Sequence, residues 1–261
     1  MQMEKNDEQK HFVLVHGAGH GAWCWYKVEN LLTSLGHKVT SLDLAASGIN
    51  PKQVDDLQSI ANYYEPLMVF MASLPKDEKV ILVGHSYNGL STSVAMERFP
   101  EKVSVAVFIS ATMPSPTNSF VDILKEYDTR QTKANMNSQY DVRQVKGSTQ
   151  IIPKPEKLAK QYQKSPPEDL ILATKLVRPI GLFGIADLLK EATVSDEKYG
   201  SVSRVFILCD EEDDIKAIFR WMIAQNPPDE VKEIPGSDHM VMISKPQELC
   251  AYLQEIAHRY S

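Results

Sequence analysis

The sequence contains little that points to a disulfide-bonded, membrane-spanning or metal-binding protein. Only three of its 261 residues are cysteines, and Cys24, Cys209 and Cys250 are widely separated. An odd number of scattered cysteines without a CxxC pair argues against a disulfide framework and against a zinc site, so no bound metal is expected. No apolar run approaches the length that crosses a bilayer. The polar segment 1–10 lacks the apolar core of a secretory signal, so we expect a cytoplasmic protein without a membrane partner.

Positive charge is also scarce. There are 28 Lys and Arg residues against 34 Asp and Glu residues, a formal net charge of −6. Nothing therefore supplies a surface that neutralises phosphates, and no nucleic-acid partner is expected. The hydrophobic fraction of 43% and the charged fraction of 24% are typical of a globular protein. The length suits one α/β domain with an insertion.

Short β-branched runs alternate with longer segments of helical spacing. The candidate strands are His11–His16, Lys38–Asp43, Lys79–Gly84, Val103–Ile109, Arg204–Cys209 and Glu230–Ile234. The candidate helices between or after them are Trp25–Leu35, Asp55–Leu74, Leu90–Phe99 and Gln247–Tyr260. Near-continuous apolar strands suit a parallel sheet that is buried on both faces. The pattern predicts an α/β fold, a mostly parallel sheet with helices on both faces.

The alternation stops between residues 112 and 199. This stretch contains two proline-rich pieces, at 113–116 and 152–155, and a polar segment near 135–150. Helical spacing returns in Pro167–Val177 and Gly184–Glu191. We therefore predict a single domain over residues 1–261, with 112–199 inserted as a helical cap over the carboxyl edge of the sheet.

The segment 80–89 reads VILVGHSYNG, a strand that enters a tight turn and then a helix. A serine at such a turn is exposed, and the following backbone N–H groups face the same space, as a nucleophile and an oxyanion require. Ser86 is therefore the candidate nucleophile. The elbow pattern G-x-S-x-G is broken, because Asn88 takes the place of the last glycine. We expect either local repacking or a changed site there.

A glycine-rich loop, HGAGHG at 16–21, follows the first strand. Such a loop can bring the backbone N–H of Ala18 beside the elbow, where the N–H of Tyr87 would be the second oxyanion donor. A nucleotide-binding loop is the alternative, but the glycines at 17, 19 and 21 do not give G-x-G-x-x-G, so no cofactor is expected. A plain turn is the third interpretation of this loop.

The segment 236–240, GSDHM, lies between the last strand and the last helix. His239 comes last in the order serine, acid, histidine and falls at the carboxyl edge of the sheet, which favours it as the base. The adjacent Asp238 is expected to be a loop residue. The triad acid should follow the strand that ends at Cys209, where the acidic run 210–214 begins, and the residues alone leave all five acids open.

These loops resemble the plant methylesterase family, which includes salicylate methylesterase, polyneuridine aldehyde esterase, methylketone synthase and the plant α/β-hydrolase hydroxynitrile lyases. Further motifs carry the resemblance: LDLAASGIN at 42–50, PKDEKV at 75–80, FPEK at 99–102, SPPEDL at 165–170 and LVRP at 176–179. The resemblance covers nearly the whole chain and is weakest over 132–155.

The resemblance implies an α/β hydrolase, often a homodimer, that acts on small esters under a cap. Ser86 and His239 match the family's nucleophile and base, and Ala18 and Tyr87 match its oxyanion donors. The acid matches Glu212, where relatives usually have aspartate, and a local shift would give the role to Asp213.

The resemblance also separates the reactions. Hydroxynitrile lyases of this family carry threonine and lysine at the positions of Gly17 and Met240, and methylketone synthase lacks the nucleophilic serine. The expected function is therefore a serine carboxylesterase that hydrolyses the methyl ester of a small plant metabolite, with decarboxylation of the acid product as a further step in alkaloid-type specialised metabolism. Two alternatives remain: a lyase or decarboxylase that uses the same pocket without an acyl-enzyme, and a non-catalytic ligand-binding protein of the hydrolase fold.

Overall fold

A six-stranded sheet forms the centre of the computed structural model, which describes residues 9–130, 138–210 and 213–260. The strands are parallel and lie in the order β2-β1-β3-β4-β8-β9. Their bounds are β1 His11–Val15, β2 Lys38–Leu42, β3 Val80–His85, β4 Val103–Ile109, β8 Arg204–Cys209 and β9 Glu230–Ile234. Each strand falls on one of the six predicted runs, and the predicted fold class is confirmed.

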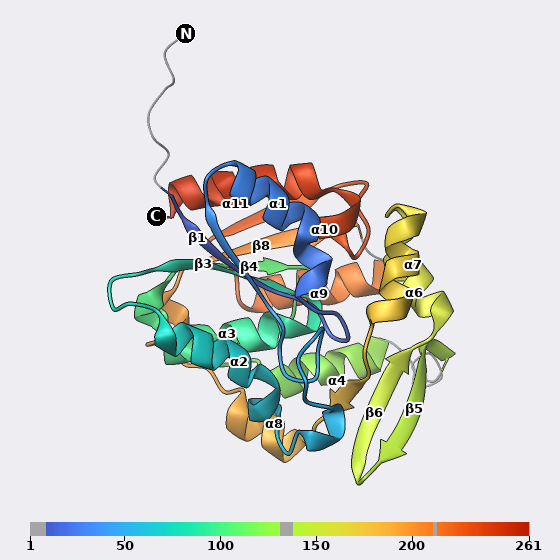
Figure 1. The fold of residues 1–261 in the computed structure, drawn as a ribbon. Helices are drawn as coiled ribbons and strands as arrows, with labels where there is room; N and C mark the ends of the chain where they lie inside the picture. Colours follow the sequence, from blue (N-terminus) through green and yellow to red (C-terminus); the bar gives the residue numbers. More distant parts are fainter. Residues whose placement is uncertain (1–8, 131–137, 211–212, 261) are drawn as a thin grey trace, which may run out of the picture.

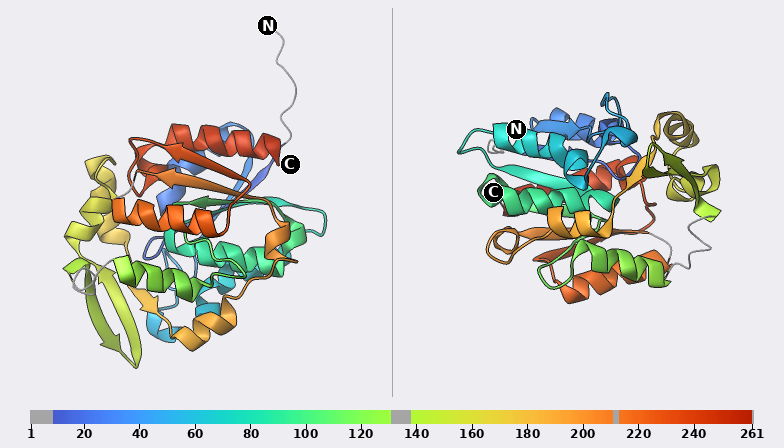
Figure 2. Two further views of the ribbon diagram at one scale, coloured as in Figure 1. Left: turned by 180° about the vertical axis from the view of Figure 1, so that it is seen from behind. Right: turned by 90° about the horizontal axis from the view of Figure 1, so that it is seen from below.

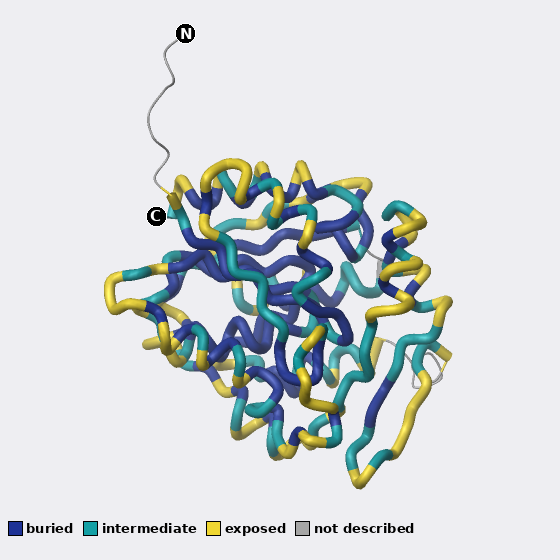
Figure 3. The backbone as a smooth tube through the Cα atoms, viewed as in Figure 1, coloured by how far each residue is buried: buried dark blue, intermediate teal, exposed yellow. Residues whose placement is uncertain are grey.

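Helices cover both faces of this sheet (Figures 1 and 2). One face carries α1 (Tyr26–Ser34), α10 (Val241–Ser244) and α11 (Pro246–Arg259), and the other carries α2 (Ile60–Ser73), α3 (Gly89–Arg98) and α9 (Asp213–Gln225). Side chains alternate along β1: Phe12 and Leu14 pack toward the first set, Val13 and Val15 toward the second. The four inner strands β1, β3, β4 and β8 are therefore buried on both sides (Figure 3), as their apolar runs predict, whereas the edge strands β2 and β9 are partly exposed.

Helix α9 was not predicted from the sequence. Its first two residues, Asp213 and Asp214, belong to the acidic run 210–214, in which the sequence analysis placed the triad acid and predicted no helix. Negative side chains in the first turn of a helix are favourable because they face the positive end of the helix dipole. The last two residues of the run, Asp213 and Asp214, therefore begin a helix.

The cap segment, residues 112–199, contains helices α4 (Phe120–Arg130), α6 (Pro155–Gln161), α7 (Pro167–Leu176) and α8 (Ile185–Glu191). It lies largely at the end of the sheet toward which the strands point (Figure 1). It also holds a three-stranded antiparallel sheet that the sequence analysis did not predict: β5 (Tyr140–Val145), β6 (Ser148–Pro153) and β7 (Ile180–Leu182). The β5–β6 turn has positive φ at Lys146 and Gly147, 47° and 84°, as a tight hairpin requires. Lysine is unusual there, so the turn carried no recognisable signal.

Arg178 joins the cap segment to the loops that follow β1 and β2. Its backbone N–H donates to the carbonyl of Gly19 at 2.8 Å. Its guanidinium donates to the carbonyls of Gly48, Asn50 and Lys52 at 3.2, 2.6 and 2.7 Å. The LVRP motif at 176–179 is thus a structural tie between the cap segment and the glycine-rich loop.

Candidate active site

The turn after β3 holds Ser86 in a left-handed backbone conformation, with φ of 56°. Non-glycine residues rarely adopt this region, and such strain persists only where the surroundings enforce it. Thr112 does so from the loop after β4: its N–H donates to the Ser86 carbonyl at 2.9 Å, and its hydroxyl donates to the Tyr87 carbonyl at 3.0 Å. Ser86 therefore sits at the strained strand-to-helix elbow that the sequence predicts.

Two glycines make room for this elbow. A Cβ on Gly84 would lie 2.1 Å from the Thr92 hydroxyl oxygen, and a Cβ on Gly89 would lie 1.8 Å from the carbonyl oxygen of Thr112. Both distances are far inside van der Waals contact. The close approach that G-x-S-x-G assigns to its last position therefore occurs one residue later, at Gly89.

Because Gly89 makes the close approach, position 88 can carry a side chain. The Asn88 side chain is fully buried. Its Nδ2 donates to the His16 carbonyl at 2.5 Å and to the Tyr63 hydroxyl at 2.9 Å, and its Oδ1 accepts from the Ser91 hydroxyl at 3.0 Å. Asn88 thus fastens the elbow to the first residue of the glycine-rich loop. Of the two expected consequences of this residue, the structure shows local repacking.

The loop between β9 and α10 brings His239 to the elbow. Its Nε2 lies 3.0 Å from the Ser86 hydroxyl oxygen, although 153 positions separate the two residues in the chain. This is hydrogen-bond distance, the geometry that a serine nucleophile and its general base require. The structure therefore brings together the two residues that the sequence singled out.

His85, which sequence reasoning missed, supports this histidine. Its Nε2 donates to the His239 carbonyl at 2.9 Å, and the two ring centroids lie 4.7 Å apart. Burial lowers the pKa of His85 well below its usual value, so its imidazole stays neutral and adds no charge beside His239. No local motif identifies this role, because it depends on the approach of a loop from the far end of the chain.

The structure does not describe the side chains of the two residues proposed as the triad acid. Glu212 lies outside the described residues, and Asp213 begins α9 without a described side chain. Asp210 is described, and its carboxylate binds the ammonium groups of Lys164, at 2.7 Å, and Lys216. These lysines lower the pKa of Asp210 to about 2. Asp210 is therefore engaged in ion pairs, and Glu212 and Asp213 stay as predictions.

The glycine-rich loop runs against the elbow. A Cβ on Gly17 would lie 2.8 Å from His85 Nδ1 and 3.1 Å from Ser86 Cβ. The loop therefore passes in direct contact with the nucleophile's own residue, and Ala18 follows immediately. This close contact gives a steric reason for glycine at position 17.

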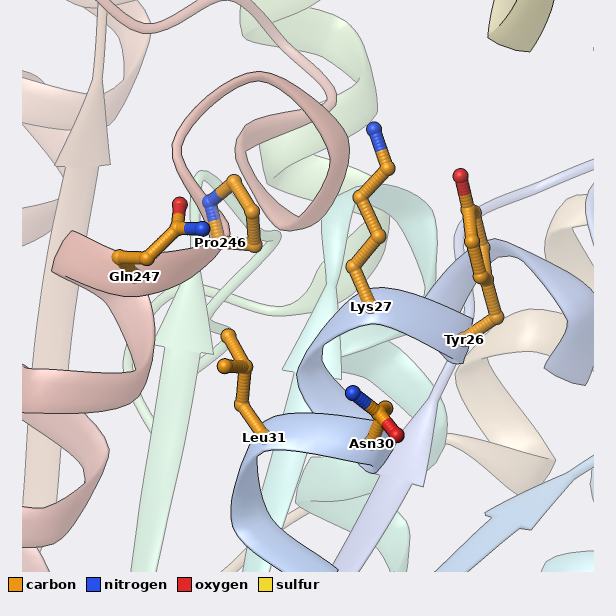
Figure 4. Close-up of a pocket in the computed structure, with 6 residues that line it drawn as sticks. All are labelled: Tyr26, Lys27, Asn30, Leu31, Pro246 and Gln247. Atoms are coloured by element: carbon orange, nitrogen blue, oxygen red, sulfur yellow. The ribbon is translucent and has the colours of Figure 1, made fainter. Parts of the chain in front are cut away.

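A surface groove of about 500 Å³ lies elsewhere, between α1 and the start of α11 (Figure 4). It is lined by Tyr26, Lys27, Asn30, Leu31, Pro246 and Gln247. None of these residues belongs to the elbow, to the His239 loop or to the glycine-rich loop. The groove is a separate feature of the α1–α11 face.

Within residues 9–130, 138–210 and 213–260, no cluster of three or more His, Cys, Asp or Glu side chains could hold a metal ion. Among the same described residues, no helix combines the length and the apolar character that crossing a membrane requires.

Comparisons with known proteins show the family of the chain. Residues 12–252 match the model of the alpha/beta hydrolase family. The chain is 59% identical to methyl jasmonate esterase 1 of Vitis vinifera, over 99% of this chain and 100% of the relative. It is 45% identical to polyneuridine aldehyde esterase of Rauvolfia serpentina, over 96% of each chain.

Solved structures support the same family assignment. Methylketone synthase I of tomato in complex with 2-tridecanone superposes with a TM-score of 0.92 at 48% identity, covering 97% of this chain and 100% of that one. Polyneuridine aldehyde esterase superposes with a TM-score of 0.90 at 45% identity, covering 96% and 100%. With its fold, its elbow serine and its paired histidine, the chain belongs to the plant methylesterase group of the alpha/beta hydrolase family and is a serine carboxylesterase.

Proposed function

We propose that the protein hydrolyses the methyl ester of a small, uncharged plant metabolite, with methyl jasmonate as the first candidate. The observation that carries this proposal is the 3.0 Å approach of His239 Nε2 to the Ser86 hydroxyl on a strained elbow. The 59% identity to methyl jasmonate esterase 1, over nearly the full length of both chains, supports the choice of substrate.

In the proposed mechanism, His239 takes the proton of Ser86 as the serine oxygen attacks the ester carbonyl. The backbone N–H groups of Ala18 and Tyr87 stabilise the oxyanion. Tyr87 lies in the first turn after the elbow, where backbone N–H groups lack partners within the helix. Methanol leaves with a proton from the imidazolium, and water then releases the acid from Ser86. Glu212 orients the imidazole, with Asp213 as the alternative.

The side chains packed beside the elbow favour an uncharged acyl group. The Tyr87 ring meets the Phe120 ring edge-on at 5.4 Å and the Tyr63 ring at 6.4 Å, and Tyr63 lies 6.5 Å from Phe183. Phe120 and Phe183 come from the cap segment. An aromatic surround with uncharged groups suits an apolar ester better than a charged one, because a charge would lose its hydration there.

Decarboxylation after hydrolysis is a second step that we keep in the proposal. Norfluorocurarine synthase 1 of Strychnos nux-vomica is 47% identical to this chain, and methylketone synthase I is among the matched structures. When the released acid carries a β-carbonyl group, loss of carbon dioxide leaves a ketone or aldehyde. A β-keto methyl ester therefore distinguishes simple hydrolysis from the two-step reaction by its products.

The test compares methyl jasmonate, methyl salicylate and a β-keto methyl ester as substrates, with the acid and carbon dioxide both measured. We expect saturable release of acid from at least one methyl ester by wild type, and labelling of Ser86 by a fluorophosphonate. Both should vanish in Ser86→Ala and His239→Ala. Activity that survives Ser86→Ala would favour the lyase or decarboxylase alternative, and tight binding without turnover would favour a ligand-binding protein.

The acid is assigned by a pair of variants, Glu212→Gln and Asp213→Asn. Loss of the acid that orients the imidazole lowers kcat by about 10⁴-fold in the best-studied serine triad. We expect a loss of that order in Glu212→Gln and little change in Asp213→Asn. The reverse result would move the role to Asp213, and no loss in either variant would contradict both assignments.

We also propose a homodimer in the cytoplasm. All three cysteines are free and buried, which suits a reducing compartment. Light scattering coupled to size exclusion measures the oligomeric state, and a monomer at all concentrations would contradict the dimer. Cell fractionation tests the location.

A further inference from the structure

One turn of the cap segment contacts both loops that carry the catalytic groups. The turn is formed by Lys164 and Ser165, between α6 and α7. The Lys164 backbone N–H and the Ser165 hydroxyl bind Asp238 in the loop that carries His239. The Lys164 ammonium group binds Asp210, the first residue of the acidic run 210–214. The contact with Asp238 gives a role to Ser165, the first residue of the SPPEDL motif at 165–170.

Asp238, in the loop that carries His239, accepts the hydrogen bonds from the cap turn. Its Oδ2 accepts from the backbone N–H of Lys164 at 2.9 Å and from the hydroxyl of Ser165 at 2.8 Å. Its Oδ1 accepts from the backbone N–H of Met240 at 2.9 Å. Asp238 is fully buried, with 0% exposure. One carboxylate therefore ties the cap turn to the residues on both sides of His239.

Asp210, the first residue of the acidic run 210–214, forms the second contact with the cap turn. Its carboxylate pairs with the Lys164 ammonium at 2.7 Å, and its backbone N–H donates to the hydroxyl of Ser237 at 3.0 Å. The Ser237 hydroxyl in turn donates to the carbonyl of Ile234 at the end of β9. The start of the acidic loop, the histidine loop and the cap turn are thus one hydrogen-bonded unit.

We propose that Asp238 is a positioning residue that holds His239 in reach of Ser86 only when the Lys164–Ser165 turn is docked. This inference rests on the proposed hydrolysis and adds a coupling between the cap segment and the base. A carboxylate that is removed from water must be hydrogen-bonded, and here two of its three bonds come from the cap turn. When the turn leaves, the carboxylate rotates toward water and draws the adjacent His239 with it.

The magnitude follows from the steep dependence of catalysis on position. A shift of about 1 Å in a catalytic group costs about 10²-fold in rate. Asp238 and His239 are neighbours in the chain, so a rotation at one backbone position displaces the other by distances of that order. The cap segment would therefore act on the rate of reaction as well as on substrate entry.

The test uses the full chain, the three single variants Asp238→Asn, Ser165→Ala and Thr174→Ala, and the double variant that combines Asp238→Asn with Ser165→Ala. Asp238→Asn replaces one acceptor oxygen by a donor, and Ser165→Ala removes only one bond from the cap side. Thr174→Ala is the matched control, because the Thr174 hydroxyl bonds within α7 to the Ile171 carbonyl and reaches neither loop. Each enzyme is titrated with a fluorophosphonate, so that kcat is expressed per labelled Ser86.

We expect kcat per labelled site to fall about 10- to 100-fold in Asp238→Asn, with KM little changed, and less in Ser165→Ala. Thr174→Ala should match wild type. Ser165→Ala should have a smaller effect in the Asp238→Asn background than in wild type, because both changes weaken the same contact between the cap turn and the histidine loop. Deuterium exchange of the 158–170 peptides should rise in both Asp238→Asn and Ser165→Ala.

Two results would overturn the proposal. A purely structural role would lower the labelled fraction while leaving kcat per labelled site at the wild-type value. Independent effects of the two variants, multiplying in the double variant, would show that the carboxylate does not act through the cap turn. If wild type hydrolyses no ester, the proposed function fails, and the rate of Ser86 labelling then takes the place of kcat in the same comparison.

Discussion

Gly89 gives the sharpest test of how the elbow is built. A Cβ at this position would lie 1.8 Å from the carbonyl oxygen of Thr112 and 2.8 Å from its carbonyl carbon. These are backbone atoms, so no side-chain rotation relieves the clash. Gly89→Ala must therefore push the loop after β4 away from α3.

The cost can be worked out from the bonds that this shift breaks. Thr112 accepts from the Leu90 N–H at 3.1 Å and donates to the Ser86 and Tyr87 carbonyls at 2.9 and 3.0 Å. At about 1 kcal/mol each, these bonds sum to about 3 kcal/mol. Overpacking adds about 1–3 kcal/mol. The better helix propensity of alanine returns about 1 kcal/mol. The free energy of unfolding should therefore fall by about 3–5 kcal/mol.

Urea denaturation followed by circular dichroism measures this change, and fluorophosphonate labelling reports whether Ser86 keeps its geometry. The matched control is Gly200→Ala, where the nearest atom to a new Cβ lies at 3.5 Å, an ordinary contact. That variant should stay within about 0.5 kcal/mol of wild type. If Gly89→Ala is as stable as Gly200→Ala and labels normally, the close approach of α3 to Thr112 is not what the elbow depends on.

Three further predictions follow from buried polar groups. Asn88→Ala removes the buried hydrogen bonds to the His16 carbonyl and the Tyr63 hydroxyl, and should lower the free energy of unfolding by about 2–3 kcal/mol; an unchanged urea midpoint would contradict this. Burial lowers the pKa of His20 to about 4, so the unfolded chain binds the proton first, and about 3 kcal/mol of stability should be lost as the pH falls from about 6.5 to 4. His20→Gln should lose less over that window, and an equal loss would refute the assignment. The three cysteines are buried, and they should react with a thiol reagent in denaturant but hardly at all in the native protein; fast native reaction would show that the core opens.

Much of the fold could be predicted because its signals are local. Apolar runs such as 103–109 fix the strands, and the alternation with helices fixes the class. The hairpin at 140–153 could not be predicted, because Lys146 stands where a turn of this kind usually has Asn or Asp. Helix α9 was missed because acidic residues suit both a loop and a helix start.

The candidate site also contains residues that could be predicted from the sequence and residues that could not. Ser86 and His239 could be found because each lies in a short motif at the carboxyl edge of a strand. The supporting residues could not, because Thr112, His85 and Asp238 act through contacts with segments that are distant in the sequence. Asn88 was noticed as a departure, but its effect depends on Gly89, which takes over the close approach.

The placement of the cap segment has a consequence for chain entropy. Strands β4 and β8 are neighbours in the sheet, yet the whole cap segment lies between them in sequence. The cost of closing a loop grows only with the logarithm of its length, so a connection of roughly 90 residues costs about 2 kcal/mol more than one of about ten. A single hydrophobic side chain buried by the segment offsets that difference. The sheet therefore tolerates large changes in the length and shape of this connection, and substrate preference can vary there while the elbow and the histidine loop keep their geometry.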